Sequence, residues 1–251
     1  MTDFWKANRY RFVYNKYILN EKRKGGTMKE ILLRMKDISK TFGSVQALKA
    51  VSLDLYAGEV LALMGENGAG KSTLMNILSG SLQPTEGEIF LKGEKVTVSN
   101  PITAKKLGIS KIHQELQIVP ELSVAENIFL GRWMKKKNGS VDFKAMSAEA
   151  RKYLEMLDVH VDPTMKLKDL RIGEQQLVEI AKAISLNSEI IIMDEPTSAI
   201  SEKEADKLFA IIRKLRSEGK GIIYITHRME EIFKIADRLT VMRDGMYIDT
   251  V

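Results

Sequence analysis

The sequence predicts an α/β fold in which helices cover both faces of a mostly parallel sheet. Three observations lead to this prediction. Short apolar, strand-like runs alternate with segments of helical periodicity along most of the chain. The runs at 60–64 and 190–193 are apolar throughout, which is typical of strands buried on both faces. Between them, over about residues 116–169, strand signals give way to helical ones, which predicts a helical insert.

Composition limits the class of protein. The chain has 251 residues, of which 44% are hydrophobic and 29% charged, as expected for a folded protein of one or two domains. No apolar run approaches the roughly 20 residues of a membrane-spanning helix. The absence of cysteine excludes disulfides and thiolate metal sites, and it fits a reducing compartment.

Residues 1–27 differ in composition from the rest. They hold seven basic and two acidic residues together with six aromatic ones, so most of the net charge of +6 lies there. We expect a boundary at this point, with one domain over 28–251. Our hypothesis is that translation begins at Met28, because Lys24-Gly25-Gly26 can be encoded by a purine-rich ribosome-binding sequence. A basic, aromatic arm at a membrane surface is the alternative.

The sequence of the first half of this domain predicts a small, mostly antiparallel β portion beside a buried strand. In chain order we expect strands at 31–38 and 51–55 around a turn at 40–43, a buried strand at 59–64, a glycine-rich loop, a helix from 74 and, after turn residues at 83–88, a strand at 89–91.

The helical insert and the second half of the core follow. Ser123 and Glu126 have the spacing of a capping box, which predicts that a helix begins there. In chain order we then expect a helix over 177–184, a strand at 190–193, a helix capped by Ser201, a strand at 221–226, a short helix and a hairpin at 243–245.

The glycine-rich loop carries the clearest chemical motif. Residues 65–72, here called the phosphate loop, fit G-x-x-x-x-G-K-[ST], in which main-chain N–H groups surround phosphate oxygens. We expect Lys71 to reach the β and γ phosphates of ATP and the Ser72 hydroxyl to bind Mg²⁺. The residues expected around the nucleotide are Gly65, Asn67, Gly68, Ala69, Gly70, Lys71, Ser72 and Thr73.

Two acidic residues end the apolar strand at 190–193. Because side chains alternate along a strand, Asp194 and Glu195 are expected to point to opposite sides and to have different roles. We assign Asp194 to the metal, directly or through water, and Glu195 to the attacking water as the general base.

With these residues the chain resembles an ATP-binding-cassette (ABC) ATPase, a P-loop NTPase, over about residues 31–251. The resemblance implies that Phe42 stacks on adenine, although a turn aromatic packed under the sheet is the alternative. It implies that Gln114 links the Mg²⁺ site to the helical insert and that His227 contacts the γ phosphate. The family's signature segment corresponds to residues 170–175, where Arg171, Ile172, Gly173 and Glu174 are expected to face the nucleotide of an opposite cassette.

Two residues depart from the family pattern. Ser201 stands where the family has an aspartate, and it is still expected to cap its helix. Arg171 replaces the signature serine. We expect its bulk to impair closure at that one site, since crowding in a packed interface is unfavourable. The alternatives are that it reaches the phosphate as a cation or that its side chain turns to solvent.

Within the family, the chain resembles the ATP-binding subunits of bacterial monosaccharide importers of the ribose, galactose and xylose type. The segments that carry this resemblance are 108–116, 122–132, 174–183 and 225–233. It implies a first cassette of two in tandem. The implied partners are a second cassette, transmembrane permease subunits and, indirectly, a periplasmic or extracellular sugar-binding protein. The implied location is cytoplasmic, on the inner face of the cell membrane.

Two other functions remain open from the sequence. One is a cassette ATPase outside transport, acting in translation or DNA maintenance. The near-neutral body argues against this function, and no nucleic acid is expected as a partner. The other is a nucleotide-binding fragment without turnover of its own, because a closed site in this family needs two cassettes.

Overall fold

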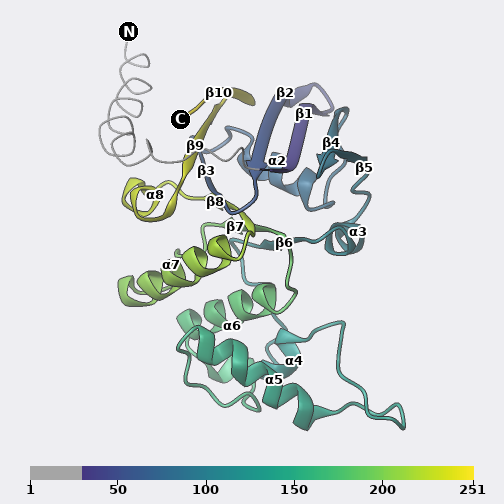
Figure 1. Cartoon of the computed structure of the whole chain (residues 1–251), viewed down its shortest axis with the longest axis vertical. Coiled ribbons are helices and arrows are strands. Elements are labelled where there is room, and N and C mark those ends of the chain that lie inside the picture. Colours follow the sequence, from purple (N-terminus) through teal and green to yellow (C-terminus); the bar gives the residue numbers. More distant parts are fainter. Residues whose placement is uncertain (1–29) are drawn as a thin grey trace.

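The computed structural model describes residues 30–251, which form two sheets and a group of helices (Figure 1). Residues 1–29 lie outside the described part, so the hypothesis on translation from Met28 is untested. Four antiparallel strands make one sheet in the order β2-β1-β4-β5: β1 (Ile31–Phe42), β2 (Val45–Tyr56), β4 (Glu86–Leu91) and β5 (Glu94–Val96).

The second sheet has six strands in the order β10-β9-β3-β8-β7-β6. They are β3 (Val60–Met64), β6 (Ile109–Ile112), β7 (Ile190–Asp194), β8 (Gly221–Ile225), β9 (Arg238–Arg243) and β10 (Met246–Thr250). All neighbouring pairs are parallel except β9 and β10, which are antiparallel. Every residue of β3, β7 and β8 is buried, as their continuous apolar sequences predict.

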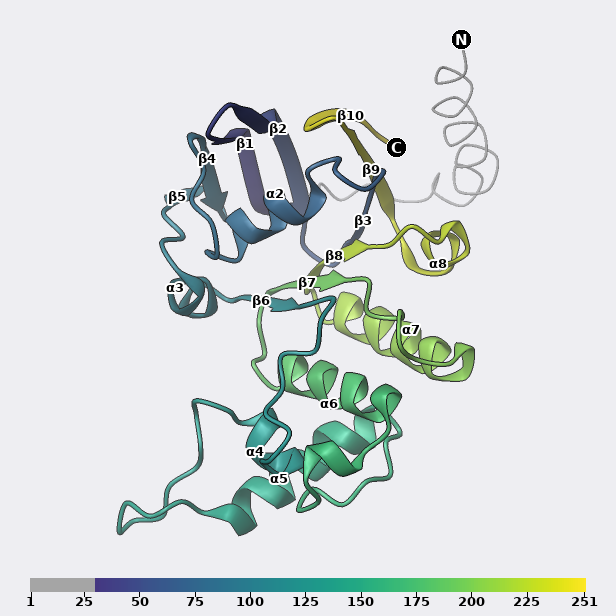
Figure 2. The ribbon, with the colours of Figure 1, turned by 180° about the vertical axis from the view of Figure 1, so that it is seen from behind.

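Helices cover both faces of this sheet. They are α2 (Lys71–Leu78), α3 (Pro101–Lys106), α4 (Val124–Ile128), α5 (Phe143–Met156), a 3₁₀ turn (Leu167–Asp169), α6 (Ile172–Ile184), α7 (Glu202–Ser217) and α8 (Met229–Ile235). Figures 1 and 2 both show α4, α5 and α6 at the end of the molecule away from the antiparallel sheet.

Alternate residues of the parallel strands pack into two different hydrophobic cores, one on each face of the sheet. Ile190, Ile192 and Ile223 pack with α2 and the antiparallel sheet. Ile191 and Ile222, their neighbours in sequence, pack with α4, α5, α6 and α7 on the other face. This alternation explains why the strands contain few polar residues, because each face is covered by its own apolar layer.

The structure confirms most of the expected elements. Ser123 and Glu126 form the predicted capping box, and Ser201 accepts a hydrogen bond from the N–H of Glu204 at the start of α7. The predicted hairpin turns at Asp244 and Gly245, whose φ angles of 53° and 75° suit a two-residue turn between antiparallel strands.

The expected turn at 40–43 is wrong. Residues 40–42 belong to β1, and the chain turns at Gly43 and Ser44 instead. The strands are longer than their apolar pattern predicts because their pairing is irregular, with positive φ at Asp37 and Ala50. The elements β5, α3 and β6 were not predicted. Within residues 30–251, no helix is both long and apolar enough to cross a membrane.

Asp237 fixes the first residues of β9 against β3. Its Oδ2 accepts a hydrogen bond from the Val60 N–H at 3.0 Å, and its own N–H donates to the Val60 carbonyl at 2.8 Å. Its other carboxylate oxygen lies 2.6 Å from Nη2 of Arg216, and the side chain is only 5% exposed. This pairing sets the register of the strand that leads into the phosphate loop.

We expect Asp237→Ala to lower the free energy of unfolding by about 2 kcal/mol, because a buried N–H and a guanidinium lose their acceptor. Urea denaturation followed by circular dichroism measures this change. The control is Asp206→Ala, which removes an exposed partner of Lys234 and is expected to change stability by less than about 0.5 kcal/mol. Equal effects of the two substitutions would contradict the role of Asp237.

Candidate functional site

Two glycines of the phosphate loop fit closely against β9 and β2. A Cβ added to Gly65 would lie 2.4 Å from the Met242 carbonyl oxygen of β9. One added to Gly70 would lie 2.7 Å from a methyl carbon of Leu48 in β2, and Gly70 also has φ of 95°. The Gly245 N–H donates to the Ala69 carbonyl at 3.3 Å. Glycine at both positions therefore lets the loop fit against its neighbours.

Lys71 begins α2 and reaches back over the phosphate loop. Its Nζ donates to the carbonyl oxygens of Gly65 at 2.7 Å and Glu66 at 3.0 Å. Burial lowers the pKa of Lys71, and the charges of Glu195 and Asp194 oppose this shift. The ammonium thus lies within electrostatic reach of both predicted carboxylates.

The remaining loop residues differ in accessibility. Gly65, Gly70 and Thr73 are half-buried, Ala69 is buried, and Asn67, Gly68 and Ser72 are exposed. The Ser72 hydroxyl is therefore accessible at the N-terminus of α2, where helix N–H groups favour anions.

The three predicted catalytic residues are in contact, because Glu195 interacts with both Gln114 and His227. Its Oε2 accepts a hydrogen bond from Nε2 of Gln114 at 3.3 Å, and its Oε1 lies 3.1 Å from Nδ1 of His227. The Glu195 N–H donates to the Ile225 carbonyl at the end of β8. Parallel pairing of β7 with β8 therefore brings Glu195 beside His227, although 32 residues separate them in sequence.

Asp194 and Glu195 have different partners, but the predicted reason for this is wrong. Strand alternation does not apply, because β7 ends at Asp194 and Glu195 has φ of 47°, in the left-handed region. Asp194 is buried and pairs with Lys111, whereas Glu195 contacts Gln114 and His227.

A second layer of polar residues supports the end of β8. The buried carboxylate of Glu231 accepts hydrogen bonds from the hydroxyls of Thr197 at 2.7 Å, Thr226 at 2.8 Å and Tyr224 at 3.0 Å. Burial, followed by the charge of Glu231, raises the pKa of Tyr224. Glu231 thus joins the segment after Glu195 to the segment before His227.

Sequence reasoning missed both Glu231 and Lys111. Glu231 lies on the buried face of a short helix, where a carboxylate needs hydrogen-bond donors. Lys111 is a charged residue in the short strand β6, whose two isoleucines are buried, and a charge in such a strand is a sequence signal for a buried ion pair. His113 and His160, which the sequence assigned no site role, lie outside the Glu195 cluster, and His160 instead pairs with the exposed Asp158.

Phe42 lies apart from these contacts. It is the last residue of β1, its ring is 46% exposed, and Nζ of Lys40 lies 5.1 Å from the ring centroid. The alternative that it packs under the sheet is wrong. Its stacking on adenine stays a prediction.

The signature segment lies at the start of α6. The Arg171 N–H donates to Oε2 of Glu174 at 2.9 Å, and Arg171 is exposed. Ile172 is 64% exposed, and Gly173 lies close to the Ala199 carbonyl. Figures 1 and 2 show α6 well separated from α2, so this chain does not bring its own signature segment to its own phosphate loop.

The predicted metal ligands suit Mg²⁺ bound together with a nucleotide. Ser72, Gln114 and Asp194 offer a hydroxyl, an amide and a carboxylate, all of them oxygen donors of the kind that Mg²⁺ prefers. Among residues 30–251 there is no cluster of three or more histidine, cysteine or acidic side chains arranged to hold a metal. The donor set therefore fits an ion that also takes phosphate oxygens as ligands.

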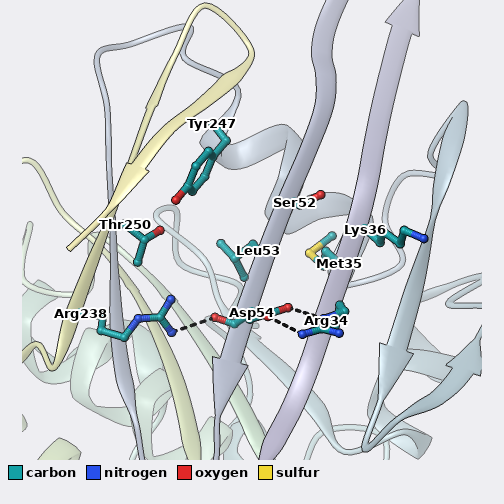
Figure 3. A pocket seen from close by; sticks show the side chains of 9 residues that line it. All are labelled: Arg34, Met35, Lys36, Ser52, Leu53, Asp54, Arg238, Tyr247 and Thr250. Atoms are coloured by element: carbon teal, nitrogen blue, oxygen red, sulfur yellow. Dashed lines mark hydrogen bonds and ion pairs between the residues drawn. The ribbon is translucent and has the colours of Figure 1, made fainter.

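A groove of about 440 Å³ lies elsewhere, between β1 and β2 on one side and β9 and β10 on the other (Figure 3). Both of its arginines are already paired: Arg34 binds the Asp54 carboxylate through two bonds of 2.8 Å, and Arg238 contacts Glu59 at 3.2 Å. None of the predicted site residues lines this groove.

Comparisons with known proteins show the family to which the chain belongs. Residues 48–198 match the family described as ABC transporter. The ribose import ATP-binding protein RbsA of Caldanaerobacter subterraneus subsp. tengcongensis is 54% identical over 219 residues, which are 87% of this chain and 44% of that protein. The putative ribose/galactose/methyl galactoside import ATP-binding protein 1 of Agrobacterium fabrum is 50% identical over 222 residues, 88% of this chain and 44% of that protein. This chain thus spans less than half the length of these relatives.

Two solved structures share the fold. A nucleotide-free ATP-binding cassette from an ABC transporter superposes with a TM-score of 0.78 at 30% identity, covering 88% of this chain and 90% of that one. The dimeric post-hydrolysis state of the cassette MJ0796, bound to ADP and Pi, gives 0.75 at 28% identity, covering 87% and 97%. The family match, the fold and the phosphate loop agree, and the chain belongs to the ABC transporter family as an ATP-binding cassette.

Proposed function

We infer that this chain binds and hydrolyses ATP and that the reaction energises import of a sugar through a membrane transporter. The observation that carries the proposal is the Glu195 carboxylate, which contacts both Gln114 and His227 within electrostatic reach of Lys71. The sugar-import part is supported by the names of the two relatives, which describe ribose and ribose/galactose/methyl galactoside import.

Each predicted site residue has its own role in ATP hydrolysis. Lys71 and the N–H groups of the phosphate loop hold the β and γ phosphates. Glu195 accepts a proton from water while the water oxygen bonds to the γ phosphorus, and the bond from that phosphorus to the β–γ bridging oxygen breaks with its electrons leaving on ADP. Gln114 and His227 orient the Glu195 carboxylate, and His227 also contacts the γ phosphate. Ser72, Asp194 and Gln114 would hold Mg²⁺, which would supply neutralising charge to the phosphates.

A second cassette completes the closed site in this proposal. The signature segment of α6, in which Arg171 is exposed and Gly173 and Glu174 are half-buried, faces the nucleotide of that partner. The dimeric MJ0796 cassette is a solved example of such pairing. The bulk of Arg171 impairs closure at this one interface, while Lys71, Glu195 and His227 serve the other. The chain works at the cytoplasmic face of the membrane with permease subunits, and a sugar-binding protein delivers the substrate.

The proposed function is tested by measuring ATP turnover of the chain alone and together with a second cassette and permease subunits in liposomes. We expect turnover to rise when the whole complex is assembled, because the signature segment of this chain lies far from its own phosphate loop. Stimulation by RNA or DNA instead would favour a cassette ATPase outside transport. Binding without turnover in any assembly would leave a nucleotide-binding role only.

We expect Lys71→Ala to weaken binding of ATP at least tenfold, because the phosphates lose their charge-assisted hydrogen bonds. Fluorescence titration with mant-ATP in the presence of Mg²⁺ measures this effect. Lys95→Ala is the control, since Lys95 is an exposed partner of Glu88 and leaves binding unchanged. Undiminished binding by the Lys71 variant would remove the phosphate loop from the proposal.

Glu195→Gln is expected to bind mant-ATP normally and to lower turnover by about 10²- to 10⁴-fold, since the amide cannot accept a proton from water. Phosphate release by the assembled complex is the measurement. Glu202→Gln, at the exposed start of α7, is the control and keeps full turnover. Fast hydrolysis by the Glu195 variant would show that another group is the base.

A further inference from the structure

A second lysine, Lys111, lies beside Asp194, the predicted metal ligand, in addition to Lys71 of the phosphate loop. It lies in β6 opposite Ile192 of β7, and Asp194 follows Ile192 by two residues, on the same face of the sheet. That face packs on the α2 side, where Ile109, Ile190 and Ile192 are buried. The Lys111 side chain is only 6% exposed, so its ammonium lies inside the molecule.

The ammonium links two parts of the site. Its Nζ donates to Oδ1 of Asn76 in α2 at 2.8 Å and lies 3.5 Å from Oδ2 of Asp194. A charged group in an apolar layer is tolerated only with such partners, because its hydration is lost. Asp194 therefore has a fixed positive charge beside it before any metal arrives.

We propose that Lys111 is a resident counter-cation of Asp194 and that it makes nucleotide binding by this site less dependent on Mg²⁺. It acts as a positioning residue through Asp194, and the proposal rests on the proposed function, in which the site takes ATP with Mg²⁺. A fixed positive charge repels a divalent cation at the same carboxylate, and it attracts the polyanionic nucleotide.

Lys111 repels Mg²⁺ and attracts the nucleotide. Because these two effects have opposite signs, they can be separated by measuring nucleotide binding with and without Mg²⁺. Without the charge of Lys111, nucleotide free of metal is held less strongly, and Mg²⁺ is held more strongly at Asp194. The enhancement of nucleotide binding by Mg²⁺, defined as the ratio of dissociation constants in EDTA and in excess Mg²⁺, therefore rises. We expect a change of roughly tenfold, which lies between the effect of a unit charge at about 4 Å in bulk water and its effect near a protein surface.

The experiment titrates the full chain with mant-ATP in EDTA and in excess Mg²⁺, comparing wild type with Lys111→Met. Lys111→Gln is the second variant, because it keeps a hydrogen-bond donor for Asn76 and removes only the charge. Lys220→Met is the matched control: Nζ of Lys220 also donates to an asparagine, Oδ1 of Asn187, at 2.8 Å, at a site away from Asp194. Circular dichroism confirms that each variant is folded.

A Mg²⁺ enhancement that rises roughly tenfold in the Lys111 variants and stays constant in the Lys220 control supports the proposal. Equal weakening of binding in EDTA and in Mg²⁺ would show a merely structural role and overturn it, as would an unchanged ratio. Wild type that binds no mant-ATP in either condition would overturn the proposed function as well, so the two failures are distinguishable.

Discussion

The alignment of three buried parallel strands is the constraint on which the site depends. In β3, β8 and β7, Leu63, Ile225 and Asp194 lie at one level of the sheet. The chain leaves each strand just beyond that level, so the phosphate loop, His227 and Glu195 emerge at the same edge. Their proximity follows from main-chain pairing of apolar segments, not from attraction among the polar side chains themselves.

Burial of polar groups beneath this edge keeps the arrangement fixed. Glu231 would be unfavourable inside the molecule without donors, and three hydroxyls from two segments, one after β7 and one at the end of β8, supply them. Because a partly satisfied buried carboxylate is costly, these segments are held in one relative arrangement. In the same way the buried Asp237 joins the start of β9 to the start of β3.

The sequence reveals those features whose signal is local, and it fails where partners are distant. The phosphate loop, the Ser123 capping box and the Asp244 hairpin depend on residues a few positions apart, and each was predictable. The first two strands were predicted too short because irregular pairing breaks their alternation, as at Asp37. Lys111 is the charged residue of a short buried strand, but its partner Asp194 is distant in the chain and only strand register brings the two together. The partners of Glu195 were predictable only through the family resemblance.

The close fit of Gly65 and Gly70 against neighbouring strands has a mechanical consequence. Gly65 and Gly70 fit closely against β9 and β2, so we expect these two ends of the loop to keep one geometry whichever nucleotide is bound, whereas Gly68 between them has open space beside it. We then expect discrimination between a triphosphate and a diphosphate to involve the residues around Glu195. There, Gln114 begins the connection to the helices and touches Glu195 through a single long hydrogen bond, which is the most easily displaced contact around that carboxylate.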